Sequence, residues 1–256
     1  MILIPRVIPV LLFQKKGLVK TVKFKNPVYV GDPINAIRIF NEKEVDELIF
    51  LDIDASIENR GPNVEIIKQF ASECFMPVTY GGGIKSCDDI RKILKIGIEK
   101  VSLNTQAIIN PGLIGEAVEN FGSSTIVVSI DIKKNLFGKY QLYSRYGIKM
   151  PSIDFVSHIK KMEDYGVGEI FINSVDQDGL MNGMDISLIR KISENVSMPV
   201  VACGGAGNLS DIGSAIRDGK ASAVAAGSMF VFHGKHKAVL ITYPTRNEIL
   251  NIFQSI

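Results

Sequence analysis

The chain has 256 residues, of which 46% are hydrophobic and 22% are charged. These fractions are close to the globular average, so a disordered or fibrous chain is excluded. Lysines and arginines number 29 against 27 aspartates and glutamates, and the net charge of +2 gives no reason to expect nucleic acid as a partner. The length suits one large domain with a sizeable core.

The apolar runs are too short to cross a membrane, because charged residues or glycines interrupt each one. The apolar start of the chain differs from a secretion signal, since it lacks a basic first region and Arg6 interrupts it. Cys74, Cys87 and Cys203 form no CxxC pair and lack metal-ligand spacing. We therefore expect a cytoplasmic protein with no metal and no cofactor.

Short β-branched runs alternate with helix-like segments along the chain. Asp32 and Pro33 mark the start of a predicted helix over 33–45, and Ser86 marks the start of one over 86–95. Eight strands, each followed by a helix-length segment at about 30 residues per unit, predict an α/β fold of the (β/α)₈ TIM-barrel type. A doubly wound open sheet is the alternative. The eight strands are expected at 6–13, 47–54, 77–80, 100–103, 125–132, 169–173, 199–203 and 222–226.

Extra elements interrupt this pattern. We expect a strand at 18–25, a hairpin-like stretch at 137–146, and an apolar run at 238–243 before the last helix. No low-complexity linker divides the chain, so residues 1–256 are predicted to form a single barrel domain.

The two halves of the chain resemble each other. The segment Met76–Gly83 in the first half matches Met198–Gly205 in the second. The match survives only in strands and in the loops that follow them. We therefore predict a two-fold repeat of half-barrels, about 1–122 and 123–256, whose related sites suit an elongated ligand with an anion at each end.

Glycine-rich loops follow one strand in each half, at 81–83 and 204–207. Glycine lets backbone N–H groups approach an anion closely, and the N-terminus of the next helix adds a favourable dipole. Neighbouring strand ends at 102–105 and 226–228 offer further donors. A phosphorylated small molecule is therefore the expected ligand at the C-terminal face of the barrel, while tight turns alone are the alternative explanation of the glycines.

Five linked motifs resemble the cyclase subunit of imidazole glycerol phosphate synthase, and the resemblance covers essentially the whole chain. The motifs are Leu51-Asp-Ile-Asp-Ala-Ser56, Gly81-Gly-Gly-Ile84, Val101-Ser-Leu-Asn-Thr105, Asp176-Gln-Asp-Gly179 and Gly204-Gly-Ala-Gly-Asn208. That family is a (β/α)₈ barrel with a glutaminase partner at its N-terminal face. The resemblance implies that ammonia from glutamine crosses the barrel interior and that a bis-phosphorylated ribulosyl aminoimidazole substrate reacts at the far face.

The resemblance also implies which residues contact phosphate. They fall into two groups, one for each end of the ligand: Gly83, Asn104 and Thr105, and then Asp178, Gly179, Gly205 and Ser228. The argument from glycine-rich loops adds Gly82, Gly204 and Gly227 to this set.

Cyclases of this family use two aspartates, at the ends of the first and fifth strands, for general acid and base work. Asp131 matches the second, but Leu12 stands at the position of the first, and the internal repeat pairs the same two residues. An alkyl side chain cannot transfer a proton, and losing such a group costs about 10²–10⁴-fold in rate. Lys20 matches the lysine of the family's mobile first loop. The resemblance thus implies catalytic roles for Asp131 and Lys20 in a site that has lost half of its acid–base pair, while a structural role at the strand end is the alternative for Asp131.

Two acids and two bases stand at the starts of predicted strands: Arg6, Glu47, Lys100 and Glu169. They match the ring of salt bridges that gates ammonia entry in the family. Alternating charges neutralise one another around a narrow opening, so a small neutral molecule could pass when one pair shifts. Solvated charges at the barrel bottom are the alternative. Glu99 matches an acid that faces the glutaminase, although an exposed acid beside a strand is also ordinary.

Retained ammonia passage with a broken acid–base pair is typical of one divergent branch of the family, the glycosyl amidation-associated proteins of surface-polysaccharide and flagellar-sugar pathways. Residues 225–232 and 236–244 resemble that branch. There, a glutaminase and the barrel supply ammonia to a separate sugar amidotransferase. We therefore hypothesise an ammonia-conducting subunit of an amidotransferase system. The alternatives are the cyclase of histidine biosynthesis, which is a lyase, and a single-chain phosphosugar isomerase.

Two further residues attract attention by their chemistry. His158 lies in a predicted amphipathic helix and is expected at its surface or boundary. Cys203 precedes the second glycine-rich loop and is expected to be a small buried residue rather than a reactive thiol.

Overall fold

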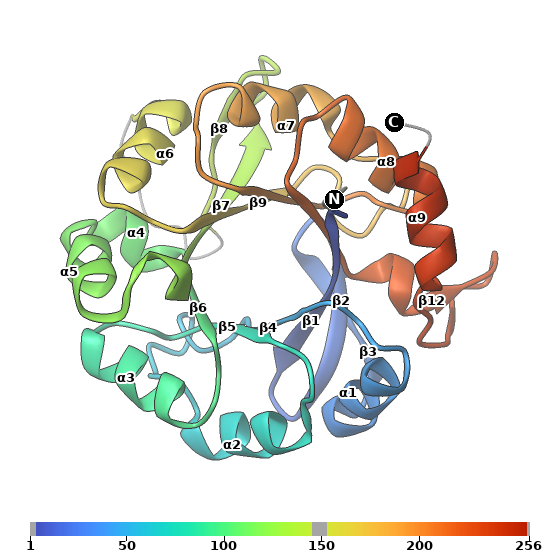
Figure 1. Cartoon of the computed structure of the whole chain (residues 1–256), viewed down its shortest axis with the longest axis horizontal. Coiled ribbons are helices and arrows are strands. Elements are labelled where there is room, and N and C mark those ends of the chain that lie inside the picture. The colour runs from blue at the N-terminus through green and yellow to red at the C-terminus, as the bar shows by residue number, and fades with distance from the viewer. Residues whose placement is uncertain (1–3, 145–152, 255–256) are drawn as a thin grey trace.

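Eight parallel strands close into a barrel in the computed structural model, which describes residues 4–144 and 153–254 (Figure 1). Each barrel strand pairs with the next one along the chain, and β11 pairs in parallel with β1, which closes the sheet. The expected (β/α)₈ barrel is therefore confirmed, and the open sheet is excluded. The barrel strands are β1 (Arg6–Gln14), β4 (Leu48–Asp52), β5 (Val78–Gly81), β6 (Lys100–Leu103), β7 (Ile126–Lys134), β9 (Glu169–Ser174), β10 (Val200–Cys203) and β11 (Ala223–Ala226).

Helices form an outer layer around the barrel (Figure 1). Asp32 and Ser86 cap the two helices whose starts the sequence predicts, since their side chains accept backbone N–H groups at 3.0 and 3.2 Å. The first helix is shorter than the predicted 33–45, because Glu44 takes a positive φ of 52° and the chain turns away. The helices are α1 (Pro33–Glu42), α2 (Val64–Glu73), α3 (Cys87–Lys95), α4 (Thr105–Ile109), α5 (Gly112–Phe121), α6 (Phe155–Asp164), α7 (Ile186–Ser193), α8 (Leu209–Arg217) and α9 (Arg246–Gln254). Within the described ranges, none of them has the length and apolar character needed to span a lipid bilayer.

Short strands outside the barrel form hairpins. β2 turns back from β1 and pairs with β3, β8 pairs with β7, and β12 pairs with β13, each time antiparallel. Their bounds are β2 (Gly17–Val22), β3 (Lys25–Gly31), β8 (Tyr140–Leu142), β12 (Phe232–His233) and β13 (Ala238–Val239).

These hairpins refine the predicted extra elements. The strand expected at 18–25 is in fact two strands, because Lys23 and Phe24 take positive φ values of 52° and 62° and reverse the chain between them. The hairpin expected at 137–146 forms through β8, although 145–146 lie outside the described residues. Of the run at 238–243, only the first two residues are strand.

Apolar side chains pack on both sides of the barrel wall. Between the sheet and the helices, Phe40, Phe50 and Phe230 are among the largest fully buried side chains. A second cluster fills the interior of the barrel and consists of Ile8, Val10, Ile49, Val127, Phe171, Val201, Ala223 and Ala225. The opening that the ribbon leaves at the centre of Figure 1 is therefore occupied by side chains.

Residues that the internal repeat pairs occupy equivalent places in the barrel. Gly82 and Gly204 directly follow β5 and β10, with φ values of 128° and 98° that glycine adopts readily. A Cβ atom on Gly82 would lie 2.4 Å from the carbonyl oxygen of Asp52, and one on Gly204 would lie 2.7 Å from that of Ser174. Close backbone packing therefore requires both glycines, whether or not an anion binds beside them.

A buried ion pair holds the loop that follows β4. The side chain of Asp52 is buried, and Arg60, whose own side chain is partly exposed, donates to its two oxygens at 2.7 and 2.8 Å. The same carboxylate accepts the backbone N–H groups of Asp54 and Ala55. Because a buried carboxylate without a cation is costly, this pair fixes the loop that covers one side of the barrel mouth.

We expect the replacement Arg60→Met to lower the free energy of unfolding by about 3 kcal/mol, the scale for a buried charge that loses its partner. Arg91→Met is the matched control, since Arg91 pairs with Asp88 at the surface, and it should cost about 0.5 kcal/mol or less. Urea denaturation followed by circular dichroism measures both. Equal unfolding free energies for the two variants would contradict the role given to Arg60.

Candidate functional site

Four charged side chains form a closed ring at the N-terminal mouth of the barrel. Arg6 donates to both Glu47 and Glu169. Lys100 Nζ lies 3.1 Å from a Glu47 oxygen and 3.2 Å from a Glu169 oxygen. The two glutamates are only 3% and 8% exposed, so each buried carboxylate is neutralised by both bases. The structure thus brings together all four residues that the sequence predicts as a ring.

The interior above the ring has one polar wall. Thr79 donates to Glu47 of the ring at 2.9 Å. Ser102 and Ser129 form a hydrogen bond with each other further along, and both are buried. The apolar cluster described above packs around this wall, so polar atoms mark a line along β5, β6 and β7 through an otherwise apolar barrel.

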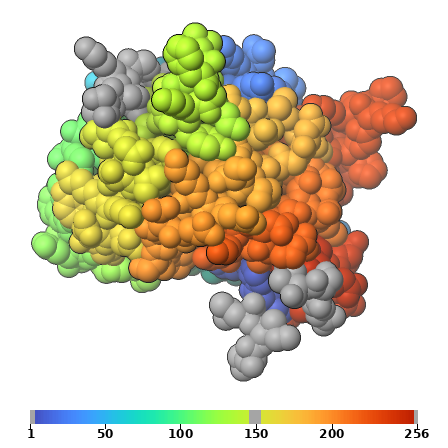
Figure 2. Space-filling model, turned by 90° about the horizontal axis from the view of Figure 1, so that it is seen from above, coloured from blue at the N-terminus to red at the C-terminus, as the bar shows by residue number. Residues whose placement is uncertain are grey.

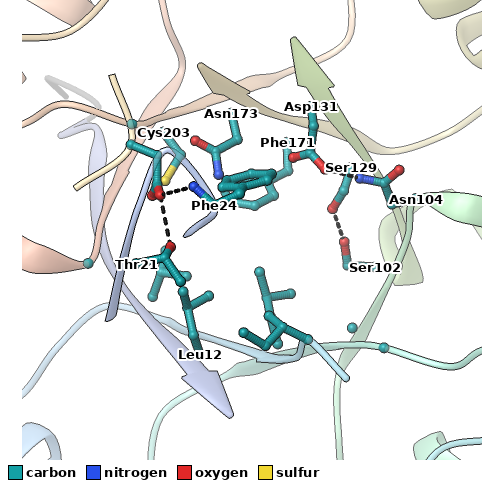
Figure 3. Close-up of a pocket in the computed structure, with 18 of the residues that line it drawn as sticks. Leu12, Thr21, Phe24, Ser102, Asn104, Ser129, Asp131, Phe171, Asn173 and Cys203 are labelled. Carbon is teal, nitrogen blue, oxygen red and sulfur yellow. Dashed lines mark hydrogen bonds between the residues drawn. The ribbon is translucent and has the colours of Figure 1, made fainter. Parts of the chain in front are cut away.

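A cavity of about 170 Å³ opens at the C-terminal ends of the strands (Figure 3). It is lined by Leu12, Lys20 and Asp131, the positions to which the resemblance directs attention. The whole set of predicted phosphate ligands lines the same cavity: Gly82, Gly83, Asn104, Thr105, Asp178, Gly179, Gly204, Gly205, Gly227 and Ser228. Residues from both half-barrels therefore meet around one space.

Asp131 lies on β7 and accepts a hydrogen bond from Asn104 Nδ2 at 2.8 Å. Burial raises the pKa of Asp131 to about 7; the Asn104 hydrogen bond opposes this shift and the nearby Asp178 carboxylate adds to it. A carboxyl group with such a pKa exchanges its proton near neutral pH, as a general acid or base must.

Leu12 faces the cavity across from Asp131 and packs on the apolar interior cluster together with Leu51 (Figure 3). The other described carboxylates that line the cavity have partners of their own. Arg60 holds Asp52, and Asp178 accepts from the β2–β3 hairpin. Within the described part of the chain, no carboxylate therefore takes the place that Leu12 leaves without one.

Lys20 projects from β2 into the cavity and is 5% exposed. Its Nζ donates to the Val10 carbonyl oxygen at 2.5 Å. Gly227 makes room for it, because a Cβ atom there would lie 2.6 Å from Nζ. Burial lowers the pKa of Lys20 to about 8, against the opposing effect of nearby Cys203 and Asp178. Lys20 and Asp131 are thus two groups of one cavity whose pKa values lie near neutrality.

Asp178 and Gly179 anchor the β2–β3 hairpin over the cavity. Thr21 and the backbone N–H of Phe24 donate to the Asp178 carboxylate at 2.8 and 3.1 Å, and Lys23 N–H donates to its carbonyl oxygen at 3.0 Å. A Cβ atom on Gly179 would lie 2.0 Å from the Thr21 carbonyl oxygen. Burial raises the pKa of Asp178, although these donors oppose the shift.

Asn173 is a cavity residue that the sequence patterns did not single out. It lies on β9 directly beside Asp131, and its buried Oδ1 atom has no partner among the described residues. A buried acceptor of this kind suits a donor from a ligand. The signal that could have found it is alternation along β9, since Glu169, Phe171 and Asn173 point to the same side of the strand.

Cys203 and His158 are the two further residues that the sequence analysis names, and the structure agrees with the prediction for the first but differs from it for the second. Cys203 lines the cavity, and burial raises the pKa of its thiol to about 12, so it is not a reactive thiolate. His158 is buried at 4% exposure rather than lying at the surface, because it belongs to the inward face of α6. Among the described residues, no group of three His, Cys, Asp or Glu side chains could hold a metal ion.

The N-terminal face also carries Glu99 and Phe75. Glu99 directly precedes Lys100, is exposed, and accepts the backbone N–H of Val78 at 2.7 Å. Phe75 stands between α2 and β5 and is 89% exposed. The sequence reasoning missed Phe75, since nothing in the local pattern indicates that this side chain lies in water.

The chain matches known proteins along almost its whole length. A family described as "Histidine biosynthesis protein" matches residues 6–237. A Pseudomonas aeruginosa protein named "Putative imidazole glycerol phosphate synthase subunit hisF2" is 54% identical over 95% of this chain and 97% of its own length. The corresponding hisF3 protein of Vibrio vulnificus is 49% identical over 95% and 94%.

A similarly named HisF protein of Leptospira interrogans is 45% identical over 95% of this chain and 96% of its own length. These matches span the ring, the cavity and the barrel strands between them. The chain therefore belongs to the histidine-biosynthesis barrel family, as a HisF-like synthase subunit.

Proposed function

We propose that this barrel accepts ammonia from a glutaminase at its ring, conducts it along the barrel axis, and delivers it at the cavity for amidation of a surface or flagellar sugar by a separate amidotransferase. The cyclase reaction is impaired in this proposal. The observation that carries it is a contrast between the two mouths. The four charges of the entrance are all present and in contact, whereas Leu12 stands where the exit needs an acid.

The polar wall supports passage of ammonia. Thr79, Ser102 and Ser129 lead from Glu47 of the ring to the Asn104–Asp131 pair. Ammonia is small and neutral, and hydroxyl groups can both donate to it and accept from it. The apolar cluster leaves no open channel for ammonia, so its passage depends on small side-chain movements around the polar wall. At the exit, the free Asn173 acceptor suits an N–H donor.

The face around the ring supports docking of the glutaminase. Phe75 exposes its aromatic ring directly after Cys74 in the chain. Glu99 is near Cys74, since burial together with the Glu99 charge raises the pKa of the Cys74 thiol to about 12. An exposed aromatic side chain is a common anchor of protein interfaces. A partner that covers Phe75 would also cover the ring and keep the released ammonia away from water.

The two glycine-rich loops, at 81–83 and 204–207, support a role for an anionic ligand at the exit. Both loops border one cavity, as an elongated ligand with two anionic ends requires. In this proposal the glycine-rich loops, Asn104, Thr105 and Ser228 bind such a ligand. The Asp178 carboxylate instead holds the β2–β3 hairpin in place. Binding of a phosphorylated sugar there would signal to the glutaminase that the sugar that accepts the ammonia is available.

The cyclase of histidine biosynthesis is the second candidate, and one observation favours it. Asp131 and Lys20 share the cavity, with pKa values of about 7 and about 8. Two groups that titrate near neutral pH can act as a base and an acid, so Lys20 could stand in for the missing aspartate. The two candidates make opposite predictions for the cyclase substrate.

The replacement Leu12→Asp should raise cyclase turnover by about 10²-fold or more, because it restores the missing proton-transfer group. The assay supplies ammonium chloride and the bis-phosphorylated ribulosyl aminoimidazole substrate, and follows imidazole formation. Leu51→Asp adds a carboxylate elsewhere in the same cavity and should give no gain. Wild-type turnover equal to that of the Leu12 variant would favour the histidine-pathway cyclase instead.

Replacing Lys100 with methionine should uncouple glutamine hydrolysis from amidation, because Glu47 and Glu169 then share only Arg6 and the ring cannot close in the same way. We expect the amount of amidated product formed per glutamine hydrolysed to fall about tenfold. Such a factor corresponds to a change of about 1.4 kcal/mol in the free-energy barrier at the ring. Lys92→Met, on exposed α3 surface, is the control. Unchanged coupling in the Lys100 variant would argue against a gate.

The replacement Phe75→Asp should weaken binding of the glutaminase by about thirtyfold or more, as expected for the loss of an aromatic anchor. Calorimetric titration of the two purified subunits measures the effect. Phe137→Asp removes an equally exposed aromatic side chain from another part of the surface and should leave this affinity unchanged. A Phe75 variant that binds like the wild type would place the glutaminase elsewhere.

A further inference from the structure

Two large apolar side chains stand fully in water at the turn between β7 and β8. Leu136 is 102% exposed and Phe137 is 88% exposed, more than nearly every other large hydrophobic residue of the described chain. We call this pair the apolar tip. Folding gains nothing from an apolar side chain that stays in water, so a pair of them at a turn marks an interaction site.

The turn that carries the apolar tip is rigidly built. Asn135 Oδ1 accepts the backbone N–H groups of Phe137 and Lys139 at 2.9 and 3.0 Å, and the backbone of Asn135 pairs with Gly138 and Lys139. Such bonds hold the backbone from which both tip side chains project. A partner that buries them therefore has little loop entropy to overcome.

The stem of the hairpin is fixed to the loop after β9. Asp185 forms an ion pair with Lys134 at 3.1 Å and accepts from the Tyr140 hydroxyl at 2.8 Å. Asp176 accepts the backbone N–H of Lys134 at 2.7 Å. The hairpin is thus a braced projection of the barrel and not a loosely attached loop.

The apolar tip lies on the face where the cavity opens. Asp131 of the cavity and Leu136 of the tip belong to the same hairpin: β7 continues about 10 Å from Asp131 to its end at Lys134, and Leu136 lies in the turn beyond. In Figure 2 this hairpin, coloured lime, projects at the top of the view, where blue residues from the first part of the chain also lie. Anything that covers the tip would also approach the mouth of the cavity.

Unpaired lysines share this face. They are exposed in the turns that border the mouth: Lys15, Lys16, Lys23 and Lys139. No carboxylate of the described residues forms an ion pair with any of them. The nearby Asp176 and Asp185 are already engaged by the hairpin stem. The face therefore offers an apolar anchor at one edge of the mouth and positive charge along its rim.

We propose that the apolar tip and these lysines dock the enzyme that consumes the ammonia, through an apolar pocket set in an acidic surface of that enzyme. The inference rests on the proposed function and extends it to the exit side. Ammonia that escapes into neutral water is diluted and mostly protonated to ammonium, which is not a nucleophile, so efficient transfer of the small amount released from glutamine needs a consumer seated over the cavity. A second copy of this chain is disfavoured as the occupant, since the lysines of two such faces would repel each other.

The test compares two nitrogen sources in a reconstituted system of barrel, glutaminase and purified sugar amidotransferase. The double variant Leu136→Asp/Phe137→Asp should lower glutamine-dependent amidation by about thirtyfold or more, the loss expected for an aromatic anchor at an interface. Amidation driven by ammonium chloride should stay unchanged, and so should glutamine hydrolysis. Ile109→Asp, which places the same charge at another exposed apolar position on α4, is the matched control.

Binding of the barrel to the amidotransferase is measured in parallel by biolayer interferometry. We expect it to weaken in the double variant, and to weaken for the wild type as salt rises, since the lysines contribute. Glutamine-dependent amidation that is equal in the wild type and the double variant would overturn the docking site alone. If the wild type itself shows no glutamine-dependent amidation, the proposed function is overturned instead. A third outcome concerns vesicles of anionic phosphatidylglycerol. If the wild type binds them and the double variant does not, while both still bind the amidotransferase, the tip is a membrane contact and the inference is overturned.

Discussion

The charged ring at the entrance constrains the rest of the barrel. Two glutamates are buried there, and a buried carboxylate is tolerated only with cations and donors around it. Arg6 and Lys100 each contact both of them, so four strands are tied together at one level. No member can move alone without exposing an unpaired charge to an apolar interior. Any opening of this mouth would therefore require a coordinated exchange of partners.

The exit follows different electrostatics. Asp131 and Lys20 lie in one cavity without forming an ion pair with each other, and burial moves the pKa of both toward neutrality. Near pH 7 the exit therefore holds groups that are partly titrated. Leu12 leaves one side of this cavity apolar. A small neutral molecule can be received there, but a reaction that needs two opposed proton-transfer groups lacks one of them.

Much of the fold follows from local patterns, and the unpredicted features depend on contacts between distant segments. Apolar runs locate the barrel strands, and charges that precede such runs identify the ring. The position of Lys20 on the Val10 carbonyl depends on how the β2–β3 hairpin lies over the mouth and on the room that Gly227 leaves. The exposure of Phe75 is likewise absent from the sequence pattern, because an isolated aromatic residue usually predicts core.

The internal repeat shows where the two halves have diverged. At the entrance, Glu47 and Glu169 keep the same residue type and the same pair of partners. At the exit, the paired positions hold Leu12 and Asp131, and the hairpins that follow them present lysines in one half and the apolar tip in the other. Each mouth thus combines retained and diverged positions, because the exit also keeps the paired glycines Gly82 and Gly204, while the two bases of the ring have no basic counterpart in the second half. The proposed function expects this combination, because a barrel that conducts ammonia without transforming a substrate needs the paired carboxylates of the ring but not both acids of a proton-transfer pair.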